Sequence, residues 1–226
     1  MDYNNVIELD EVTFRRLYWF IWKEKCKNSN LWWTYYWFCK GVINIIVLAG
    51  KSASGKNFVA KKLEEHGYET IVTYTTRPKR KNEKQDITYH FISDEEFKQK
   101  INEGFFAEWK SYITNEGIWY YGSSLEDIEN ADDKSVIILT PQGYRDIKEK
   151  FPDKNIACIY LYENIDTMKK RLSKRGDNPK EIERRIKSDL EDFKNFESEA
   201  DKIVYNNDGT DIDEVIKKIL DFMEDK

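Results

Sequence analysis

The stretch IIVLAGKSASGKNFVAKKL, from Ile45 to Leu63, decides how this chain folds. It begins as an apolar run, passes through small residues and a lysine, and then takes on the character of a helix. Its core, GKSASGKN, fits the pattern G-x-x-x-x-G-K-[ST] everywhere except at the last place, where Asn57 replaces a serine or threonine. In a strand, loop and helix of this kind, backbone N–H groups and the positive end of the helix dipole converge on phosphate. The sequence therefore predicts a nucleoside triphosphate site.

The residues expected to bind the triphosphate lie in this loop, where Lys56 would reach the β- and γ-phosphates. Asn57 is a candidate metal ligand, although Mg²⁺ would be held largely by phosphates and water. Ala53 stands where glycine is common, and we expect the loop to tolerate it if its backbone is not left-handed. An ordinary strand-to-helix turn is the alternative, but strand, loop, lysine and helix all fall in place. The candidate loop residues are Gly50, Ser52, Ala53, Ser54, Gly55, Lys56 and Asn57.

The composition narrows the class of protein. The chain has 226 residues, of which 35% are charged, and its net charge of -5 provides no basic field for nucleic acid. Its three cysteines lack the spacing of zinc ligands and fit a reducing cytoplasm, and its two histidines argue against a His-rich metal site. We therefore expect a cytoplasmic protein with no nucleic-acid partner. The sequence leaves the oligomeric state open.

Residues 1–42 form an aromatic-rich N-terminal extension that holds five of the seven tryptophans. Part of it, around residues 14–22, has the apolar spacing of an amphipathic helix. Its apolar runs are shorter than the ~18 residues that span a bilayer, so we expect no transmembrane segment. Three interpretations stay open: a helix packed on the domain or on a partner, an interfacial membrane attachment through Trp and Tyr, or a segment with no folded role.

Residues 43–226 alternate between apolar strands and amphipathic helices. The stretches VINIIVLA, SVIIL, NIACIYLY and DKIVY are typical of strands buried on both faces. Alternation of this kind predicts an α/β domain with a parallel sheet. The middle of the chain differs, because ETIVTYTT, ITYHFI, FFAEWKSYI and IWYYG are short, aromatic and alternating. These stretches predict a small mixed sheet inserted into the α/β core.

The segment TYTTRPKRKNEKQDITYHF, at residues 73–91, indicates a second anion site. Arg77 and Arg80 are three residues apart and are followed by Glu83 and Tyr89. Two guanidinium groups can clamp one phosphate, and a tyrosine hydroxyl can add a further donor. Taken alone, RPKRKNEK could equally be a charged surface loop.

Together with EWKSYITNEGIWYYGSS at residues 108–124, this segment resembles the guanylate kinase family. The family signature runs T-T-R-x-x-R-x-G-E, then Y-x-F, then E-W or a similar pair, then Y-Y-G-[ST]. The resemblance extends roughly over residues 43–210. It implies a P-loop NTPase-type parallel sheet flanked by helices, with the core at 43–72 and 134–226, a monophosphate-binding insert at about 73–125 and a helical lid at about 170–190. It also implies an ATP-dependent kinase that converts ATP and GMP to ADP and GDP with Mg²⁺.

The resemblance assigns roles at the acceptor site. Glu108 would accept hydrogen bonds from N1–H and the N2 amino group of guanine. Adenine offers a lone pair there, so the wrong base would cost several kcal/mol. Thr73 would donate its hydroxyl to guanine O6. The full set of implied acceptor-binding residues is Thr73, Arg77, Arg80, Glu83, Tyr89, Glu108, Tyr121, Ser123 and Thr140.

Later, MKKRLSKRGDNPKEIERRI at residues 168–186 resembles the lid of the family. Its Arg171, Arg175 and Arg185 would neutralise charge on the phosphoryl group during transfer. A solvated basic helix is the alternative for this stretch alone. Asn206, in VYNND, matches a position near the adenine of ATP.

Departures from the family pattern keep other functions open. Asn82 and Asp86 replace glycines in the acceptor loop, and both residue types tolerate left-handed backbone. Thr140 stands where relatives have an aspartate that helps to read guanine, and ITNEGI lengthens the turn before WYYGS. A nucleoside monophosphate kinase with other or relaxed acceptor specificity is therefore one alternative. A non-catalytic guanylate-kinase-like binding module is another, although Lys56 and the lid arginines favour catalysis.

Overall fold

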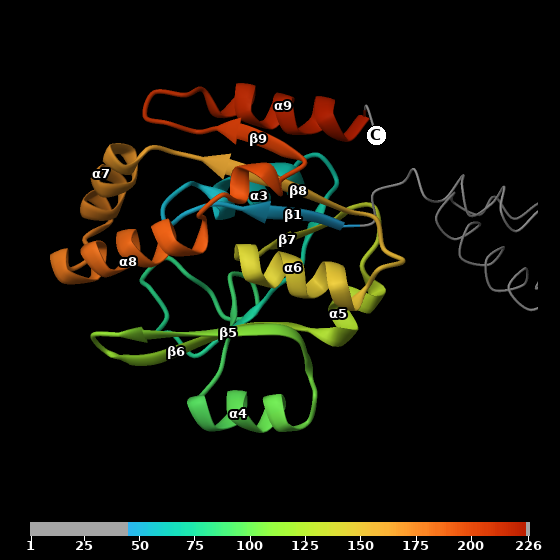
Figure 1. Cartoon of the computed structure of the whole chain (residues 1–226), viewed down its shortest axis with the longest axis vertical. Coiled ribbons are helices and arrows are strands. Elements are labelled where there is room, and N and C mark those ends of the chain that lie inside the picture. Colours follow the sequence, from blue (N-terminus) through green and yellow to red (C-terminus); the bar gives the residue numbers. More distant parts are fainter. Residues whose placement is uncertain (1–44, 225–226) are drawn as a thin grey trace, which may run out of the picture. The chain divides into compact units, whose positions relative to one another are not determined.

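The computed structural model describes residues 45–224, so the expectations for residues 1–42 lie outside the described part. Its core is a five-stranded parallel sheet with the strand order β2-β7-β1-β8-β9 (Figure 1). The strands are β2 Glu69–Thr70, β7 Ser135–Ile138, β1 Ile45–Ala49, β8 Ile156–Tyr162 and β9 Lys202–Tyr205. No helix within residues 45–224 is long and apolar enough to cross a membrane. The predicted α/β fold with a parallel sheet is confirmed.

Strand β1 lies in the middle of this sheet, and all five of its residues are fully buried. Successive side chains point to opposite faces, so Ile46 and Leu48 pack on one face while Ile45 and Val47 pack on the other. Helices α3 (Lys56–Glu64) and α9 (Ile212–Glu224) cover the first face. Helix α6 (Pro141–Lys150) and the short η1 (Phe196–Ser198) cover the second. Burial on both faces explains why these strands are apolar throughout.

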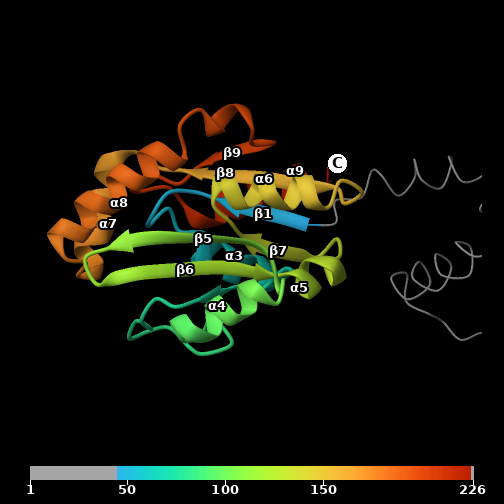
Figure 2. The same cartoon turned by 60° about the horizontal axis from the view of Figure 1, so that its bottom comes forward.

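A four-stranded mixed sheet with the order β4-β3-β6-β5 forms the insert. Its strands are β4 His90–Phe91, β3 Tyr74–Thr75, β6 Gly117–Ser124 and β5 Phe106–Thr114. Helix α4 (Asp94–Asn102) lies on the side of this sheet away from the core, and α5 (Leu125–Asn130) follows β6 (Figure 2). The predicted inserted sheet is confirmed, but ETIVTYTT divides between the two sheets, since Glu69–Thr70 pairs with β7 in the core.

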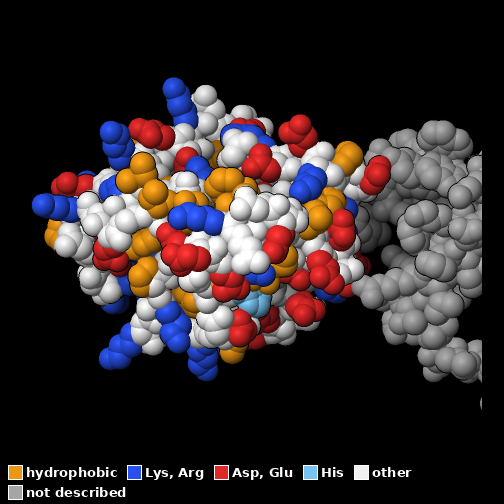
Figure 3. All heavy atoms as spheres, turned by 90° about the horizontal axis from the view of Figure 1, so that it is seen from below, with side chains coloured by type: hydrophobic (Ala, Val, Ile, Leu, Met, Phe, Trp, Pro, Cys, Tyr) orange, Lys and Arg blue, Asp and Glu red, His pale blue; other side chains and the backbone are white. Residues whose placement is uncertain are grey.

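Helices α7 (Ile165–Arg175) and α8 (Pro179–Asp192) follow β8 and occupy the segment predicted to be a lid. The chain reverses between them at Gly176, whose φ of 86° favours glycine, and Asn178 caps α8 through the amide of Lys180. Met168, Leu172 and Ile182 join the two helices in a small apolar cluster of their own. The face seen from below in Figure 3, on the side where Figure 1 draws α4, carries both acidic and basic side chains between apolar ones.

The buried side chains of β8 should carry much of the stability of the core sheet. Ile159 is fully buried among residues of β1, α3 and α9, so Ile159→Ala should lower the free energy of unfolding by about 2 to 5 kcal/mol. Urea denaturation followed by circular dichroism measures this loss. Ile113, which is 81% exposed, is the matched control, and Ile113→Ala should change stability by less than about 0.5 kcal/mol. Equal losses from both variants would contradict the core assignment.

Candidate active site

A cavity of about 500 Å³ lies at the carboxyl end of the core sheet, where the insert, α7 and α8 also meet. Ligand sites of open α/β sheets commonly lie at this edge. Most of the site residues expected from the sequence line this cavity. Those that line it are Gly50, Ser52, Ala53, Gly55, Lys56, Asn57, Thr73, Arg77, Arg80, Glu83, Tyr89, Glu108, Tyr121, Thr140, Arg171, Arg175 and Arg185.

Three expected residues, Ser54, Ser123 and Asn206, are buried and do not line the cavity. Residues 50–57 form the phosphate loop. The Asn206 side chain donates to the Ser54 carbonyl at 2.7 Å and so holds this loop from the side away from the cavity. A Cβ atom at Gly55 would lie 2.7 Å from Asn206 Nδ2, and Gly55 has a φ of 97°. Glycine is therefore needed at position 55 for both its backbone conformation and its missing side chain.

Lys56 begins helix α3 and folds back over its own loop. Its Nζ atom donates to the carbonyl oxygens of Gly50 at 2.6 Å and Lys51 at 2.8 Å. Burial lowers the pKa of Lys56, while the nearby carboxylates of Glu163 and Asp189 oppose that shift. The ammonium group thus lies within the loop, where a phosphate would be held.

The backbone of Ala53 is left-handed, with a φ of 63°. The condition for tolerating alanine at this position is therefore not met, and an alanine in this conformation costs about 1 kcal/mol. Arg171 Nη1 donates to the Ala53 carbonyl at 3.2 Å, which ties α7 to the strained loop. In the segment between β3 and β4, Asp86 is left-handed with a φ of 60°, a conformation that aspartate tolerates, whereas Asn82 is not left-handed.

The part of the cavity that residues 77–89 line is organised by the ion pair of Arg77 and Glu83. Two hydrogen bonds join the groups, at 2.9 Å and 2.7 Å, and Arg77 is only 4% exposed. Glu83 also accepts from the backbone amide of Arg80 at 2.8 Å. Burial raises the pKa of Glu83, but Arg77 and Arg80 hold it below its usual value. In this structure Glu83 holds Arg77 and Arg80 in place, and the rings of Tyr89 and Tyr121 lie beside them.

Glu108 lies on β5 and lines the cavity. The Ser123 hydroxyl donates to Glu108 Oε1 at 2.6 Å. Burial raises the pKa of Glu108 to about 7, against the opposing effect of this hydrogen bond. A Cβ atom at Gly143 would lie 2.8 Å from Glu108 Oε2, so a larger residue there would displace the carboxylate from its present position. Thr140 lies nearby, and its hydroxyl caps α6 by accepting from the Gly143 amide at 3.1 Å.

Sequence reasoning missed several polar groups at the site. Glu163 directly follows β8, is only 1% exposed, and has no hydrogen-bond partner for either carboxylate oxygen within residues 45–224. Burial raises its pKa to about 7, and Lys56 and Lys51 oppose the shift. The sequence did carry one signal for Glu163, because a charged residue directly follows an apolar strand there.

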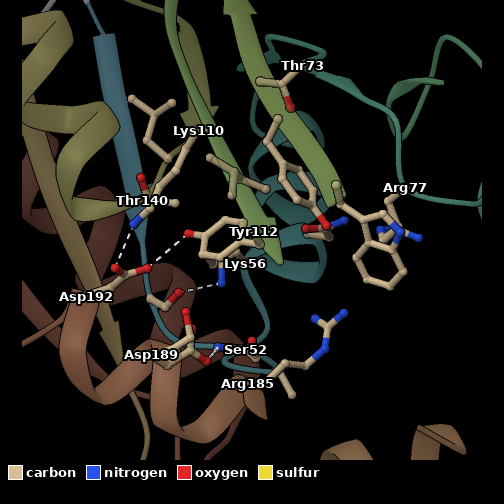
Figure 4. Close-up of a pocket in the computed structure, with 18 of the residues that line it drawn as sticks. Ser52, Lys56, Thr73, Arg77, Lys110, Tyr112, Thr140, Arg185, Asp189 and Asp192 are labelled. Atoms are coloured by element: carbon tan, nitrogen blue, oxygen red, sulfur yellow. Dashed lines mark hydrogen bonds and ion pairs between the residues drawn. The ribbon is translucent and has the colours of Figure 1, made fainter. Parts of the chain in front are cut away.

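Four further missed residues come from β5 and α8 (Figure 4). They are Lys110 and Tyr112 on the strand, and Asp189 and Asp192 on the helix, and all four line the cavity. The signal in the sequence was their spacing. Residues two apart on a strand share a face, as residues three apart on a helix do. The partner element that each pair meets could not be deduced from spacing.

The arginines of α7 and α8 reach the cavity with partners of their own. Arg175 pairs with Asp177, and Arg185 Nε lies 2.8 Å from Glu181 Oε1. The Arg185 guanidinium also lies over the ring of Trp119, 5.9 Å from its centroid. Together with Lys56, these cations place positive charge around one cavity. Such an arrangement can hold two phosphorylated molecules with their phosphates facing each other.

Comparison with known proteins gives one consistent family. The family model described as guanylate kinase matches residues 43–226. A guanylate kinase of Campylobacter jejuni strain RM1221 is 32% identical over 183 residues, covering 78% of this chain and 87% of the relative. One from Prochlorococcus marinus is 31% identical over 191 residues, covering 80% and 97%. The crystal structure of guanylate kinase from Anaplasma phagocytophilum covers 81% of this chain and 85% of its own, with a TM-score of 0.62 and 24% identity, which shows a shared fold.

The burial of Glu108 should make stability depend on pH. Its pKa rises from 4.5 to about 7 on folding, so its contribution to stability is present below pH 4.5 and is lost as the pH rises through 7. Glu108→Gln removes this dependence. Between pH 4.5 and 8, the variant should therefore gain on the order of 3 kcal/mol in unfolding free energy relative to the unmodified protein. Urea denaturation at both pH values measures the gain.

The control for this experiment is Glu116→Gln, which removes an exposed carboxyl group at the turn between β5 and β6. Its difference from the unmodified protein should be the same at both pH values. If the Glu108→Gln difference is equally constant, burial does not raise the pKa of Glu108 in the folded protein.

Proposed function

The chain belongs to the guanylate kinase family, and we propose that it transfers the γ-phosphoryl group of ATP to GMP, giving ADP and GDP. One observation carries this proposal. The phosphate loop with Lys56 and the acceptor residues Arg77 and Glu108 line the same cavity. The donor and the acceptor can therefore meet inside a single site.

The phosphate loop supplies the donor half of the site. When the triphosphate enters, the Lys56 ammonium exchanges the carbonyl oxygens of its own loop for phosphate oxygens, which carry more negative charge. Asn206 holds the loop through its hydrogen bond to the Ser54 carbonyl. We also propose that Asn206 lies near the adenine of bound ATP.

At the acceptor half, Arg77 and Arg80 bind the phosphate of GMP, with hydroxyl donors from Tyr89 and Tyr121. The existing pair with Glu83 supports this role because it fixes the Arg77 fork before the ligand arrives. Less rotational entropy is then lost on binding.

The base of the acceptor is read by Glu108 in its ionised form. The Ser123 hydroxyl occupies one acceptor position on Oε1, which leaves lone pairs on both oxygens for the two adjacent donors of guanine. Thr73 donates to O6, while Thr140 contributes a hydroxyl but no charge. Because the pKa of Glu108 is about 7, binding of GMP should weaken as the pH falls below 7.

In the transfer step, an anionic oxygen of the GMP phosphate forms the new bond to the γ-phosphorus of ATP. The bond from that phosphorus to the bridging oxygen of ADP breaks, and its electron pair leaves with ADP. No general base is required, because the attacking oxygen carries no proton. Lys56, Arg171, Arg175 and Arg185 neutralise the charge that spreads over the transferred group.

An ATP-dependent kinase generally uses a divalent cation, and we infer Mg²⁺ for this one. Asn57 lines the cavity and offers an amide oxygen. Residues 45–224 contain no cluster of three His, Cys, Asp or Glu side chains that could hold a metal ion. The residues present thus fit a cation carried mainly by nucleotide phosphates and water, where it would offset phosphate charge.

The domain boundaries belong to the same proposal: a core at 43–72 and 134–226, an insert at about 73–125, and a lid at about 170–190. A cytoplasmic location is also part of the proposal, and the unpaired, buried thiol of Cys158 supports it.

Thr140 favours one second candidate function, a kinase with broader acceptor choice, because the position lacks a carboxylate to read guanine.

The proposal is tested by coupled ADP release from ATP and Mg²⁺, with GMP, dGMP, AMP, CMP, UMP and dTMP as separate acceptors. We expect turnover with GMP to exceed that with AMP by about 10²-fold or more, because AMP leaves the Glu108 carboxylate facing a lone pair. Lys56→Ala should abolish turnover with GMP. Comparable rates with several bases would favour the broader acceptor choice, and silence with all six would favour a binding module without catalysis.

Asn57 should make the enzyme demand more Mg²⁺ than a hydroxyl at that position would. Asn57→Ser restores a hydroxyl, so the Mg²⁺ concentration for half-maximal turnover should fall several-fold at fixed ATP. Titration of Mg²⁺ in the coupled assay measures this change. An unchanged requirement would mean that the side chain at position 57 does not contact the metal.

A further inference from the structure

Helix α8 presents two carboxylates to the cavity, from Asp189 and Asp192. Residues three apart lie on the same face of a helix, so both side chains point in the same general direction. Figure 4 shows that they meet different parts of the protein. Asp192 faces β5 of the insert, while Asp189 faces the phosphate loop of the core.

The contact of Asp192 with the insert consists of an ion pair and a hydrogen bond. Lys110 Nζ lies 2.6 Å from Asp192 Oδ1, and the Tyr112 hydroxyl donates to Oδ2 at 3.0 Å. The side chains of Lys110 and Asp192 are 27% and 20% exposed, so solvent screens this pair less than it would a surface pair. Burial, together with the Asp192 charge, raises the pKa of Tyr112. Its hydroxyl therefore stays protonated and remains a donor.

The same face of β5 carries the residue proposed to read the base. Glu108, Lys110 and Tyr112 alternate along the strand, so their side chains leave it in the same direction. Whatever fixes Lys110 and Tyr112 against α8 therefore also fixes the strand that presents Glu108. A loose strand at this place would cost GMP part of its binding free energy as ordering entropy.

Asp189 contacts the core through a hydrogen bond from the backbone of the phosphate loop. The Ser52 amide donates to Asp189 Oδ2 at 2.7 Å. The Asp189 carboxylate is half-buried and also lies near Lys56. A phosphate bound in this loop would therefore lie against the same loop segment that α8 contacts.

We propose that Asp189 and Asp192 are positioning residues that make α8 a coupling helix between the donor and acceptor sites. Phosphate in the loop restrains the helix further through Ser52 and Asp189. The restrained helix then holds Asp192 more firmly against Lys110 and Tyr112, and so restrains β5. An acceptor that binds afterwards loses less entropy, so each ligand raises the affinity for the other by the same factor. This inference rests on the proposed kinase function.

The test measures binding of GMP by calorimetry, with and without a saturating non-hydrolysable ATP analogue. In the unmodified protein the analogue should lower the Kd for GMP by about 5-fold or more. In Asp192→Asn each ligand should still bind alone, within a few-fold of its normal Kd, while the analogue no longer changes the Kd for GMP. Lys110→Met should behave in the same way, and the double variant should lose no more coupling than either single one.

Matched controls separate coupling from general damage. Glu191→Gln removes one negative charge from the neighbouring, exposed position on α8 and should leave the coupling intact. Tyr112→Phe deletes a single hydroxyl and serves if Asp192→Asn does not fold, and it should lose part of the coupling. Lys110→Arg keeps the ion pair and should retain most of it.

Two outcomes would overturn the inference. One is binding of both ligands to the unmodified protein without mutual effect, and the other is full coupling in both Asp192→Asn and Lys110→Met. Failure of the unmodified protein to bind GMP at all would have a different meaning. It would remove the proposed function itself, because no acceptor site would then exist to be coupled.

Discussion

The site depends on the parallel pairing of β1 with β7 on one side and β8 on the other. This register places Ala49 beside Tyr160, so the strands end at a common edge. The phosphate loop leaves β1 at this edge, Thr140 follows β7, and Glu163 follows β8. Because β1 is buried on both faces, the loop cannot shift without disturbing two apolar clusters. The packing of the core sheet therefore fixes the position of the phosphate loop.

Around that rigid edge, charges are balanced within the protein before any ligand is present. Arg77 is nearly buried and is held by Glu83, and Asp192 is held by Lys110. Unpaired charges at such depth would cost several kcal/mol each, so these pairs allow a dense set of cations to lie close together. Glu163 is the exception, since its carboxylate has no hydrogen-bond partner within residues 45–224, although two lysines lie near it. Balanced charge thus preorganises the cavity for anionic ligands.

The features that sequence could predict were those carried by local pattern. The apolar strands, the phosphate loop and the inserted sheet all follow from spacing and composition over a few residues. The left-handed backbone of Ala53 could not be deduced, because the surrounding structure imposes it. The partners of Asp189 and Asp192 could not be deduced either, because contacts between residues distant in sequence depend on the packing of whole elements. Glu83 is an intermediate case. The sequence predicted that it belongs to the site, but not that it holds Arg77 in place.

The hydrogen bond from Asn206 to the Ser54 carbonyl spans 152 positions along the chain. A ribosome synthesises the phosphate loop before the side chain that holds it, because Asn206 follows Ser54 in the chain. β8 and β9, which lie in the sheet with β1, also follow the loop. A nascent chain therefore carries the complete loop sequence before the residues that contact it have been made. The loop can take the conformation described here only after Asn206 has been synthesised.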